Sequence, residues 1–265
     1  MRATPLPLQA WPSEQRRRIL GVFTDIDDTL TTEGAITPSA LQALTQLRDA
    51  GLWVVAITGR PVGWSEPFAA CWPLHAIVAE NGAVALIPTG DGGVQKRYRS
   101  DEATRRQQFV QLQEVLHAIE TQIPGAQRAQ DSAGRETDIA IDHSEFTHLD
   151  AASIDAVVHH MRAAGLHATV SSIHINGWLG DHHKRVGAEW IVRELWGREL
   201  ELERDHWAFI GDSSNDALMF EYVPHSIGVA NIARFLPTMS VAPRYLTQAE
   251  RGEGFAEFVQ ALLDR

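Results

Sequence analysis

Short apolar segments alternate with amphipathic helical segments near both ends of this chain, and this alternation limits the folds open to it. Apolar runs rich in β-branched and aromatic residues occupy 19–24, 52–58 and 206–212, and helical patterns occupy 38–50 and 185–197. Runs of this length are typical of strands that are buried on both faces. Strands that alternate with helices predict a parallel sheet with crossover helices. We therefore expect an α/β fold with a Rossmann-like parallel-sheet core.

The middle of the chain follows a different order. Polar helical patterns at 101–121 and 151–164 are each followed by two short strand-like segments, the clearest being the alternating TDIAIDH at 137–143. Glycine-rich stretches at 88–93 and 177–180 flank this unit. An order of helix, strand, strand that occurs twice predicts a small α+β unit with one open sheet face. We expect it to be an inserted cap domain.

The expected organisation is a core in two pieces, interrupted by one insertion. The first core part spans 1–99, the cap spans 100–179, and the second core part spans 180–265. We expect residues 1–17 to form a poorly ordered lead-in.

Charge and cysteine content narrow the class of protein further. The net charge is −11, from 34 acidic and 23 basic residues, which argues against nucleic acid or an anionic membrane as the partner. The N-terminus lacks the apolar centre of a signal peptide, and no stretch reaches the roughly 18 apolar residues of a membrane span. The single cysteine, Cys71, cannot form an internal disulfide, and we expect it to be a buried packing residue. We expect a cytoplasmic protein, and the oligomeric state stays open.

Polar segments follow three of the apolar runs, and they carry the candidate chemistry. DIDD, TGR and GDSSND each stand where a strand is expected to end. Ligands of open parallel sheets bind beyond the carboxyl ends of the strands, so one site should collect the side chains of Asp25, Asp27, Thr58, Asp212 and Asp216. Carboxylates gathered in this way predict a hard divalent cation. Mg²⁺ prefers oxygen ligands, and it would offset the repulsion among the carboxylates.

This set closely resembles the four motifs of the haloacid dehalogenase-like hydrolase superfamily. The matching residues, in chain order, are Asp25-Ile26-Asp27-Asp28-Thr29-Leu30, then Thr58 followed by Gly59 and Arg60, then Lys184 ahead of a helix, then GDSSND with Asp212 and Asp216. AENGAV at 79–84 is similar to the segment that precedes the cap in the Cof-like subgroup. The insertion resembles that subgroup's cap, in the branch of sucrose-phosphate and mannosyl-3-phosphoglycerate phosphatases.

The resemblance implies a Mg²⁺-dependent phosphatase that works through an aspartyl-phosphate intermediate. Asp25 is implied as the nucleophile, and Asp27 as the general acid and base. The metal ligands implied are the Asp25 carboxylate, the Asp27 backbone carbonyl and Asp212, with Asp216 supporting them. Asp28 is assigned only a minor role, because many relatives have glycine there.

The resemblance also implies a phosphate-binding set. Thr58, Gly59 and Lys184 are expected to hold the phosphoryl oxygens, where negative charge must be stabilised during transfer. Asn215 is expected to orient the phosphate. The implied partner is a small phosphorylated molecule. Arg60 is expected only to hold the loop after Thr58.

The cap is expected to choose the substrate. In SIHING, alternation places His174 and Asn176 on one face of a strand, opposite the isoleucines. We expect this face to line the cleft, with Arg128 and Arg135 holding a second anionic or hydroxylated group. The expected substrate is a sugar phosphate or a glycosyl-phosphoglycerate. The buried packing of Trp178 and a surface position for the 182–183 histidine pair are also expected.

Two other functions remain open at this point. Phosphomannomutases have a similar core and cap, so a phosphosugar mutase is the first alternative. A receiver-like module that binds Mg²⁺ or phosphate without catalysis is the second. Asp27 and the insertion favour an enzyme, because receiver domains need neither.

Overall fold

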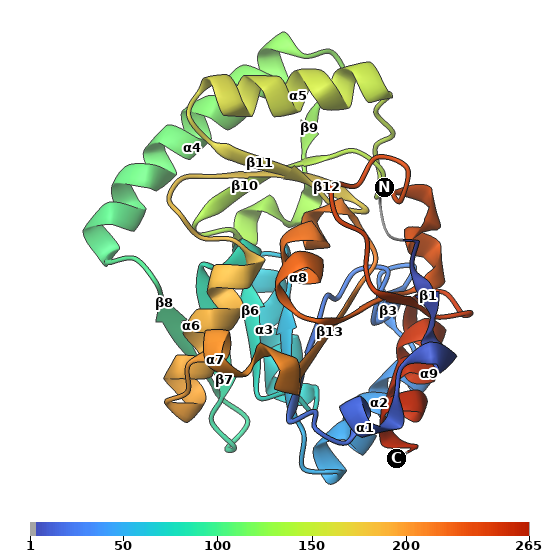
Figure 1. Cartoon of the computed structure of the whole chain (residues 1–265). Coiled ribbons are helices and arrows are strands. Elements are labelled where there is room, and N and C mark those ends of the chain that lie inside the picture. Colours follow the sequence, from blue (N-terminus) through green and yellow to red (C-terminus); the bar gives the residue numbers. More distant parts are fainter. Residues whose placement is uncertain (1–3, 265) are drawn as a thin grey trace.

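The structure is a computed structural model that describes residues 4–264. We keep the names core (4–99 and 180–264) and cap (100–179) for the predicted parts, whose boundaries stay a prediction. In Figure 1 a large sheet lies below a smaller one, and helices cover both faces of the large sheet. The parallel-dominated sheet confirms the predicted α/β class.

The large sheet has nine strands within residues 4–264. In spatial order they are β1 (Leu6–Pro7), β15 (Tyr245–Leu246), β14 (His225–Gly228), β13 (Trp207–Gly211), β2 (Gly21–Thr24), β5 (Trp53–Ile57), β6 (Ala76–Ala79), β7 (Val84–Pro88) and β8 (Val94–Tyr98). Neighbours are parallel from β1 to β6, and β7 and β8 add an antiparallel edge. The carboxyl ends of β2, β5 and β13 therefore lie at one edge of the sheet. A separate hairpin, β3 (Thr31–Thr32) and β4 (Ala35–Ile36), follows the first of these ends.

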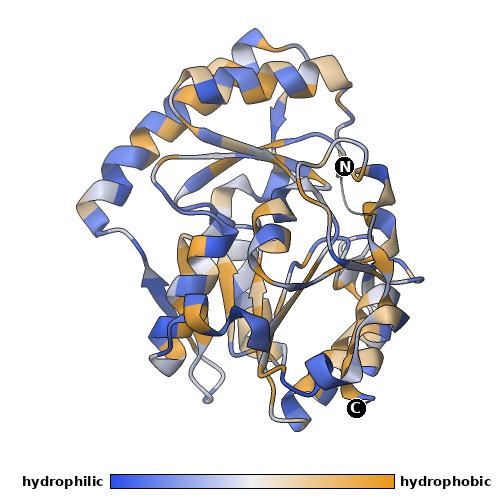
Figure 2. Ribbon diagram, in the orientation of Figure 1, coloured by the Kyte–Doolittle hydropathy of each residue, from blue (hydrophilic) through white to orange (hydrophobic). Residues whose placement is uncertain are grey.

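Alternation along the central strands explains the two helical layers. Val22 and Val54 face one layer, whereas Phe23 and Val55 face the other. The first layer is formed by α2 (Pro38–Asp49), α3 (Val62–Cys71) and α9 (Arg251–Leu263). The second is formed by α6 (Lys184–Trp196), α7 (Leu200–Glu203) and α8 (Ala217–Tyr222). Figure 2 shows the apolar residues concentrated in the central strands, while the helices mix polar and apolar residues.

The cap contains a four-stranded antiparallel sheet. Its strands, in spatial order, are β11 (His167–Val170), β12 (His174–Trp178), β10 (Asp138–Asp142) and β9 (Gln127–Arg128). The helices α4 (Glu102–Gln122) and α5 (Ala151–Ala163) pack on the face away from the core (Figure 1). The chain order α4, β9, β10, α5, β11, β12 confirms the predicted double helix–strand–strand pattern. The other sheet face is turned toward the core.

The N-terminal segment corrects one prediction. Residues 4–17 are not a loose lead-in, because β1 pairs with β15 and a short helix, α1 (Ser13–Arg16), follows. Trp11 is only 2% exposed and stacks against Tyr245 and Phe258. The buried ring of Trp11 anchors the segment, and no periodic pattern in the sequence predicted this. Residues 1–3 lie outside the described part of the chain.

The structure also tests three smaller predictions, on Cys71, on the edge of the large sheet and on membrane-spanning helices. Cys71 is exposed at the end of α3, so the prediction that it is buried was wrong. Strand β8 was missed because its sequence, VQKRY, has the polar character of a sheet edge. Among residues 4–264, no helix combines the length and apolar character needed to cross a bilayer.

Candidate active site

Lys184 and Asp25 are in direct contact at the carboxyl edge of the large sheet. Asp25 directly follows β2, and its backbone N–H continues the pairing with β13 by donating to Ile210 O at 2.9 Å. Lys184 is the first residue of α6 and is 2% exposed. Its Nζ lies 2.5 Å from Asp25 Oδ1 and 2.7 Å from Asp216 Oδ1. Strand ends and a helix start therefore bring together the residues predicted from three separate motifs.

Three carboxylates crowd around this lysine. One ligand oxygen each of Asp25, Asp212 and Asp216 lie within 4.8 Å of one another. Asp216 is fully used by the protein, because Oδ1 accepts from Lys184 and Oδ2 accepts the backbone N–H groups of Asp212 and Ser213 at 3.0 and 3.2 Å. This agrees with a supporting role for Asp216 rather than direct metal ligation.

Asp212 has the opposite character. It is 0% exposed, and its Oδ1 has no hydrogen-bond partner among residues 4–264. Its Oδ2 accepts from Asn231 Nδ2 at 3.3 Å. A buried, unpaired carboxylate oxygen costs free energy unless a cation or donor meets it. The donor set of Asp25 and Asp212 therefore fits a hard, oxygen-loving cation such as Mg²⁺.

Protonation at this cluster follows from burial. Burial, with the carboxylates of Asp216 and Asp27, outweighs the attraction of Lys184 and raises the pKa of Asp25 to about 7. Burial, followed by Asp25 and Asp216, raises the pKa of Asp212 well above its usual range. Burial would lower the pKa of Lys184, but Asp216 and Asp25 outweigh it and hold that pKa above its ordinary value. A positive charge added near Asp212 would favour the ionised carboxylates.

The loop after β5 supplies the next predicted residues. Thr58 is fully buried, and its Oγ1 accepts the backbone N–H of Arg60 at 3.0 Å, which leaves its own hydrogen free to donate. The carbonyl of Gly59 accepts from Arg135 Nη1 at 3.0 Å and from Asn176 Nδ2 at 3.2 Å. A Cβ on Gly59 would stand 3.1 Å from Asn176 Oδ1, so the cap closes tightly on this loop.

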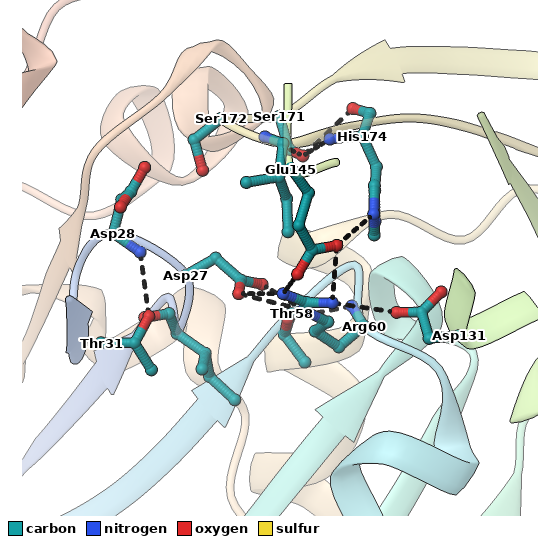
Figure 3. A network of polar contacts seen from close by, with 12 residues as sticks. Asp27, Asp28, Thr31, Thr58, Arg60, Asp131, Glu145, Ser171, Ser172 and His174 are labelled. Atoms are coloured by element: carbon teal, nitrogen blue, oxygen red, sulfur yellow. Dashed lines mark hydrogen bonds and ion pairs between the residues drawn. The ribbon is translucent and has the colours of Figure 1, made fainter. Parts of the chain in front are cut away.

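Arg60 links the loop to Asp27 and to the cap, as Figure 3 shows. Its Nε lies 3.0 Å from each carboxylate oxygen of Asp27. Its Nη1 donates to Asp131 at 3.1 Å, and its Nη2 donates to Glu145 at 2.7 Å. His174 Nε2 lies 2.9 Å from the other oxygen of Glu145. Arg60 therefore does more than hold its own loop.

Glu145 and Asp131 were missed in the sequence. Both come from irregular cap segments, where no periodic pattern or motif marks them. Burial opposes the ionisation of Glu145, but hydrogen bonds with His174 and Arg60 outweigh it and lower the pKa of Glu145 to about 2. Arg60 also lies 4.8 Å from the ring centroid of Trp64, which supports its position.

The predicted cap residues divide into two groups. His174 and Asn176 do face the core, as alternation along β12 requires. Arg135 is buried, and its two Nη groups donate to Gly59 O, Asp131 and Asp138, so it links cap to core; within residues 4–264 its Nε has no hydrogen-bond partner. Arg128 was expected to hold a group of the substrate in the cleft. In the structure it is exposed and pairs with Glu120 of α4 at 2.6 Å.

Three further residues lie where the chain returns from the cap to the core. Trp178 is buried, as predicted, and its Nε1 donates to the carbonyl of His182 at 2.8 Å. His182 is only 7% exposed, so the expected surface position was wrong for it. Its neighbour His183 accepts the backbone N–H of Val186 at 3.3 Å and thereby caps α6.

Glu80 forms a second link between core and cap that the sequence did not indicate. It is fully buried, and its carboxylate accepts backbone N–H groups from Val62 at 3.0 Å and Glu136 at 2.9 Å. The backbone N–H and the hydroxyl of Thr137 both donate to it at 2.5 Å. Its neighbour Asn81 reaches Asp138 of the cap at 3.3 Å. The AENGAV segment therefore carries a structural joint.

Within residues 4–264, three cavities border Asp25, Asp27 or Lys184. One of about 360 Å³ is lined by Lys184 and Asn215 of the core and by Trp178 of the cap. A second, of about 10 Å³, is lined by Asp25, Asp27 and Asn215 of the core and by Ser172 and His174 of the cap, and its volume is close to that of one water molecule. A third, of about 760 Å³, is lined by Asp27, by Arg60 and by loops of both parts. A cavity of about 10 Å³ beside Asp25 is too small for a phosphate ester, so we expect the cap to move away from the core when substrate enters.

The chain is similar to known phosphatases and hydrolases in sequence. The family model described as haloacid dehalogenase-like hydrolase matches residues 22–128, a range that contains Asp25, Asp27 and Thr58. A phosphoglycolate phosphatase from Haloarcula marismortui is 28% identical over 250 residues, which cover 92% of this chain and 97% of that protein.

Solved structures share the fold. A protein from Thermoplasma acidophilum has a TM-score of 0.69 at 17% identity, covering 92% of this chain and 98% of that one. The sucrose-phosphatase from Synechocystis sp., solved with sucrose and phosphate, has a TM-score of 0.65 at 16% identity, covering 92% and 97%. At these identities the likeness extends to the arrangement of helices and strands.

Proposed function

We propose that the chain is a haloacid dehalogenase-like hydrolase, and that it acts as a magnesium-dependent phosphatase of phosphate monoesters. One observation carries the proposal. Asp25, held 2.5 Å from Lys184, shares a buried pocket with Asp212, whose Oδ1 lacks a partner within residues 4–264. Asp25 can serve as the nucleophile, Lys184 can neutralise charge on the phosphoryl group, and the unpaired oxygen of Asp212 can bind a cation.

Two steps make up the proposed reaction. In the first, a carboxylate oxygen of Asp25 attacks phosphorus, and the bond from phosphorus to the leaving-group oxygen breaks. Asp27 gives its proton to that oxygen, so the leaving group departs as an alcohol. In the second, water attacks the phosphorus of the aspartyl phosphate and gives a proton to Asp27. Inorganic phosphate is released, and Asp25 is again a carboxylate.

Other residues hold the charge that develops on the phosphoryl group. Lys184 presents a cation, and Thr58 has a hydroxyl hydrogen free to donate, so both can bind phosphoryl oxygens. Asp25, Asp212 and the backbone carbonyl of Asp27 would hold the Mg²⁺. When bound, the ion supplies the positive charge that lets an anionic nucleophile meet an anionic ester.

A sugar phosphate or a glycosyl-phosphoglycerate is the proposed substrate class. The cap turns His174 and Asn176 toward the site, and such polar groups suit hydroxylated leaving groups. One relative is named a phosphoglycolate phosphatase, and one structure of similar fold is a sucrose-phosphatase solved with sucrose and phosphate. Both names concern phosphate esters.

A phosphate-release screen tests this function. The purified chain is incubated with Mg²⁺ and with sugar phosphates, phosphoglycerates and p-nitrophenyl phosphate. We expect release that disappears on metal chelation and in the Asp25→Asn variant. Release from none of these esters would refute a phosphatase. A hexose 1-phosphate with a bisphosphate activator separates the alternative, because a mutase forms an isomer without releasing phosphate.

A further inference from the structure

Asp28 adopts a left-handed backbone conformation, which is uncommon for residues other than glycine although Asp takes it more readily than most. Its φ is +55°, in the left-handed region, and it directly follows Asp27. Strain of this kind persists only where the surroundings hold it in place. The Asp28 carboxylate contacts Arg234 Nη2 and Arg251 Nε, each at 3.1 Å. The carboxylate of Asp28 therefore contacts two arginines beside the loop that carries Asp25 and Asp27.

The two arginines line the 760 Å³ cavity that also borders Asp27 and Arg60. Arg234 lies on the segment after β14, and Arg251 is the first residue of α9. Phe146 and Ile173 of the cap contribute apolar parts of the same wall. A leaving group bonded to phosphorus beside Asp25, with its oxygen at Asp27, would extend into this cavity.

The donors of these arginines are poorly matched by the protein. Across residues 4–264, the Arg251 side chain makes no hydrogen bond, and its Nε is buried. Arg234 makes one hydrogen bond, to Asp28 Oδ2, and stands 3.7 Å from Asp212 Oδ2. A guanidinium offers five N–H donors in a planar fork. Most of that capacity faces the cavity or solvent.

The two arginines face two carboxylates of the protein. Arg234 and Arg251 meet Asp28, and Arg234 also stands 3.7 Å from Asp212 Oδ2, so a bound anion must compete with these carboxylates for the free donors. The exposed carboxylate of Glu33 lines the same cavity, so an anion gains only by reaching the arginines directly.

We propose that Arg234 and Arg251 bind a second anionic group, a carboxylate or a phosphate, on the leaving group of the substrate. Asp28 is the positioning residue that aims the two guanidinium groups into the cavity. Forked N–H donors suit both kinds of anion. This inference rests on the proposed phosphatase function and selects, among phosphate esters, those that carry two anionic groups.

Matched substrate pairs test the inference. 3-Phosphoglycerate differs from glycerol 3-phosphate by a carboxylate, and fructose 1,6-bisphosphate differs from fructose 6-phosphate by a phosphate. We expect the wild-type kcat/KM to favour at least one doubly anionic member by about tenfold or more, and the pair that responds identifies the anion. Equal kcat/KM within both pairs would overturn the inference.

Variants assign the preference to the arginines. Arg251→Gln should reduce the ratio of kcat/KM within the responding pair about tenfold, and Arg251→Lys should restore part of it. Arg234→Gln is the second variant. Arg193→Gln is the control, because Arg193 pairs with Glu199 on an exposed surface, and its ratio should equal that of the wild type. A ratio unchanged in both Arg251→Gln and Arg234→Gln would reject the assignment.

A binding measurement keeps this test separate from turnover. In the Asp25→Asn protein with Mg²⁺, calorimetry should give a Kd for the doubly anionic ester about tenfold below that of its partner. Absence of any phosphate release by the wild type, together with this difference in Kd, refutes the phosphatase and supports the anion site. Phosphate release without any difference in Kd or kcat/KM supports the phosphatase and refutes the anion site.

Discussion

Arg60 Nε lies 3.0 Å from each carboxylate oxygen of Asp27, while the same guanidinium reaches Glu145 of the cap at 2.7 Å. Asp27, the residue proposed as general acid and base, is therefore held by Arg60, which also contacts the cap. If the cap moved away from the core, Arg60 would lose Glu145 and Asp131 and would keep Asp27. We therefore expect the position of Asp27 to depend on the contact between cap and core.

Replacement of Arg60 should impair chemistry more than binding. We expect Arg60→Ala to lower kcat by about 100-fold, because a small misplacement of a catalytic group has that effect. The measurement is kcat and KM with p-nitrophenyl phosphate, together with the pH profile of kcat. Arg97→Ala is the control, since Arg97 pairs with Glu194 on the surface. A lower kcat in both variants, or a change confined to KM, would contradict this role.

The nucleophile gives the sharpest kinetic prediction. Asp25→Asn should lower kcat by at least about 1,000-fold, because the amide cannot form the phospho-enzyme. Circular dichroism and the thermal midpoint should show an intact fold. Rapidly quenched wild-type protein should gain the mass of one phosphoryl group, and the variant should not. Substantial turnover by the variant would exclude Asp25 as the nucleophile.

Magnesium should stabilise the protein through Asp212. Ligand that binds only the folded state raises stability by about 2.7 kcal/mol at one hundred times Kd. We therefore expect Mg²⁺ to raise the Tm of the wild type and to leave that of Asp212→Asn nearly unchanged. Asp155→Asn, an exposed substitution on α5, should keep the wild-type shift. The idea fails if Mg²⁺ raises the Tm of Asp212→Asn as much as that of the wild type.

His182 should make stability depend on pH. Burial, followed by the charge of Arg99, lowers the pKa of His182 to about 4. An unfolded histidine binds a proton below about pH 6.5, whereas folded His182 does so only near pH 4. Stability therefore falls as pH drops through this window, by up to about 3 kcal/mol.

Urea unfolding at pH 7 and at pH 4.5 measures this loss. His182→Gln should show a smaller decrease in the free energy of unfolding than the wild type. His117→Gln, at an exposed position on α4, should lose as much as the wild type. Equal losses in the wild type and His182→Gln would show that this imidazole is not responsible.

Much of the site was predictable because its parts stand at ends of regular elements. Asp25, Thr58 and Asp212 follow strands, and Lys184 begins a helix, so apolar periodicity and topology together predict one edge for all four. Alternation along β12 likewise predicted the facing of His174 and Asn176. These predictions needed only local patterns and the rule that parallel strands share a carboxyl edge.

The remaining parts depend on long-range contacts that leave no local pattern. Arg60 meets Glu145 from a cap loop 85 positions away, and Glu80 meets Thr137 across 57 positions. Arg128 differs, because its partner Glu120 is only eight positions away, but the two residues meet across the turn from α4 to β9 and follow no periodic pattern. Charged residues on irregular segments choose partners only once the tertiary structure exists.

The pairing of β1 with β15 has a consequence for handling the protein. Loss of the segment through Trp11 would uncover the backbone N–H and C=O groups of β15 and the aromatic rings of Tyr245 and Phe258. A bare strand edge beside an apolar patch recruits other chains. We therefore expect the N-terminal segment to reduce self-association. A chain without the residues through Trp11 should aggregate although it keeps every residue of the candidate active site.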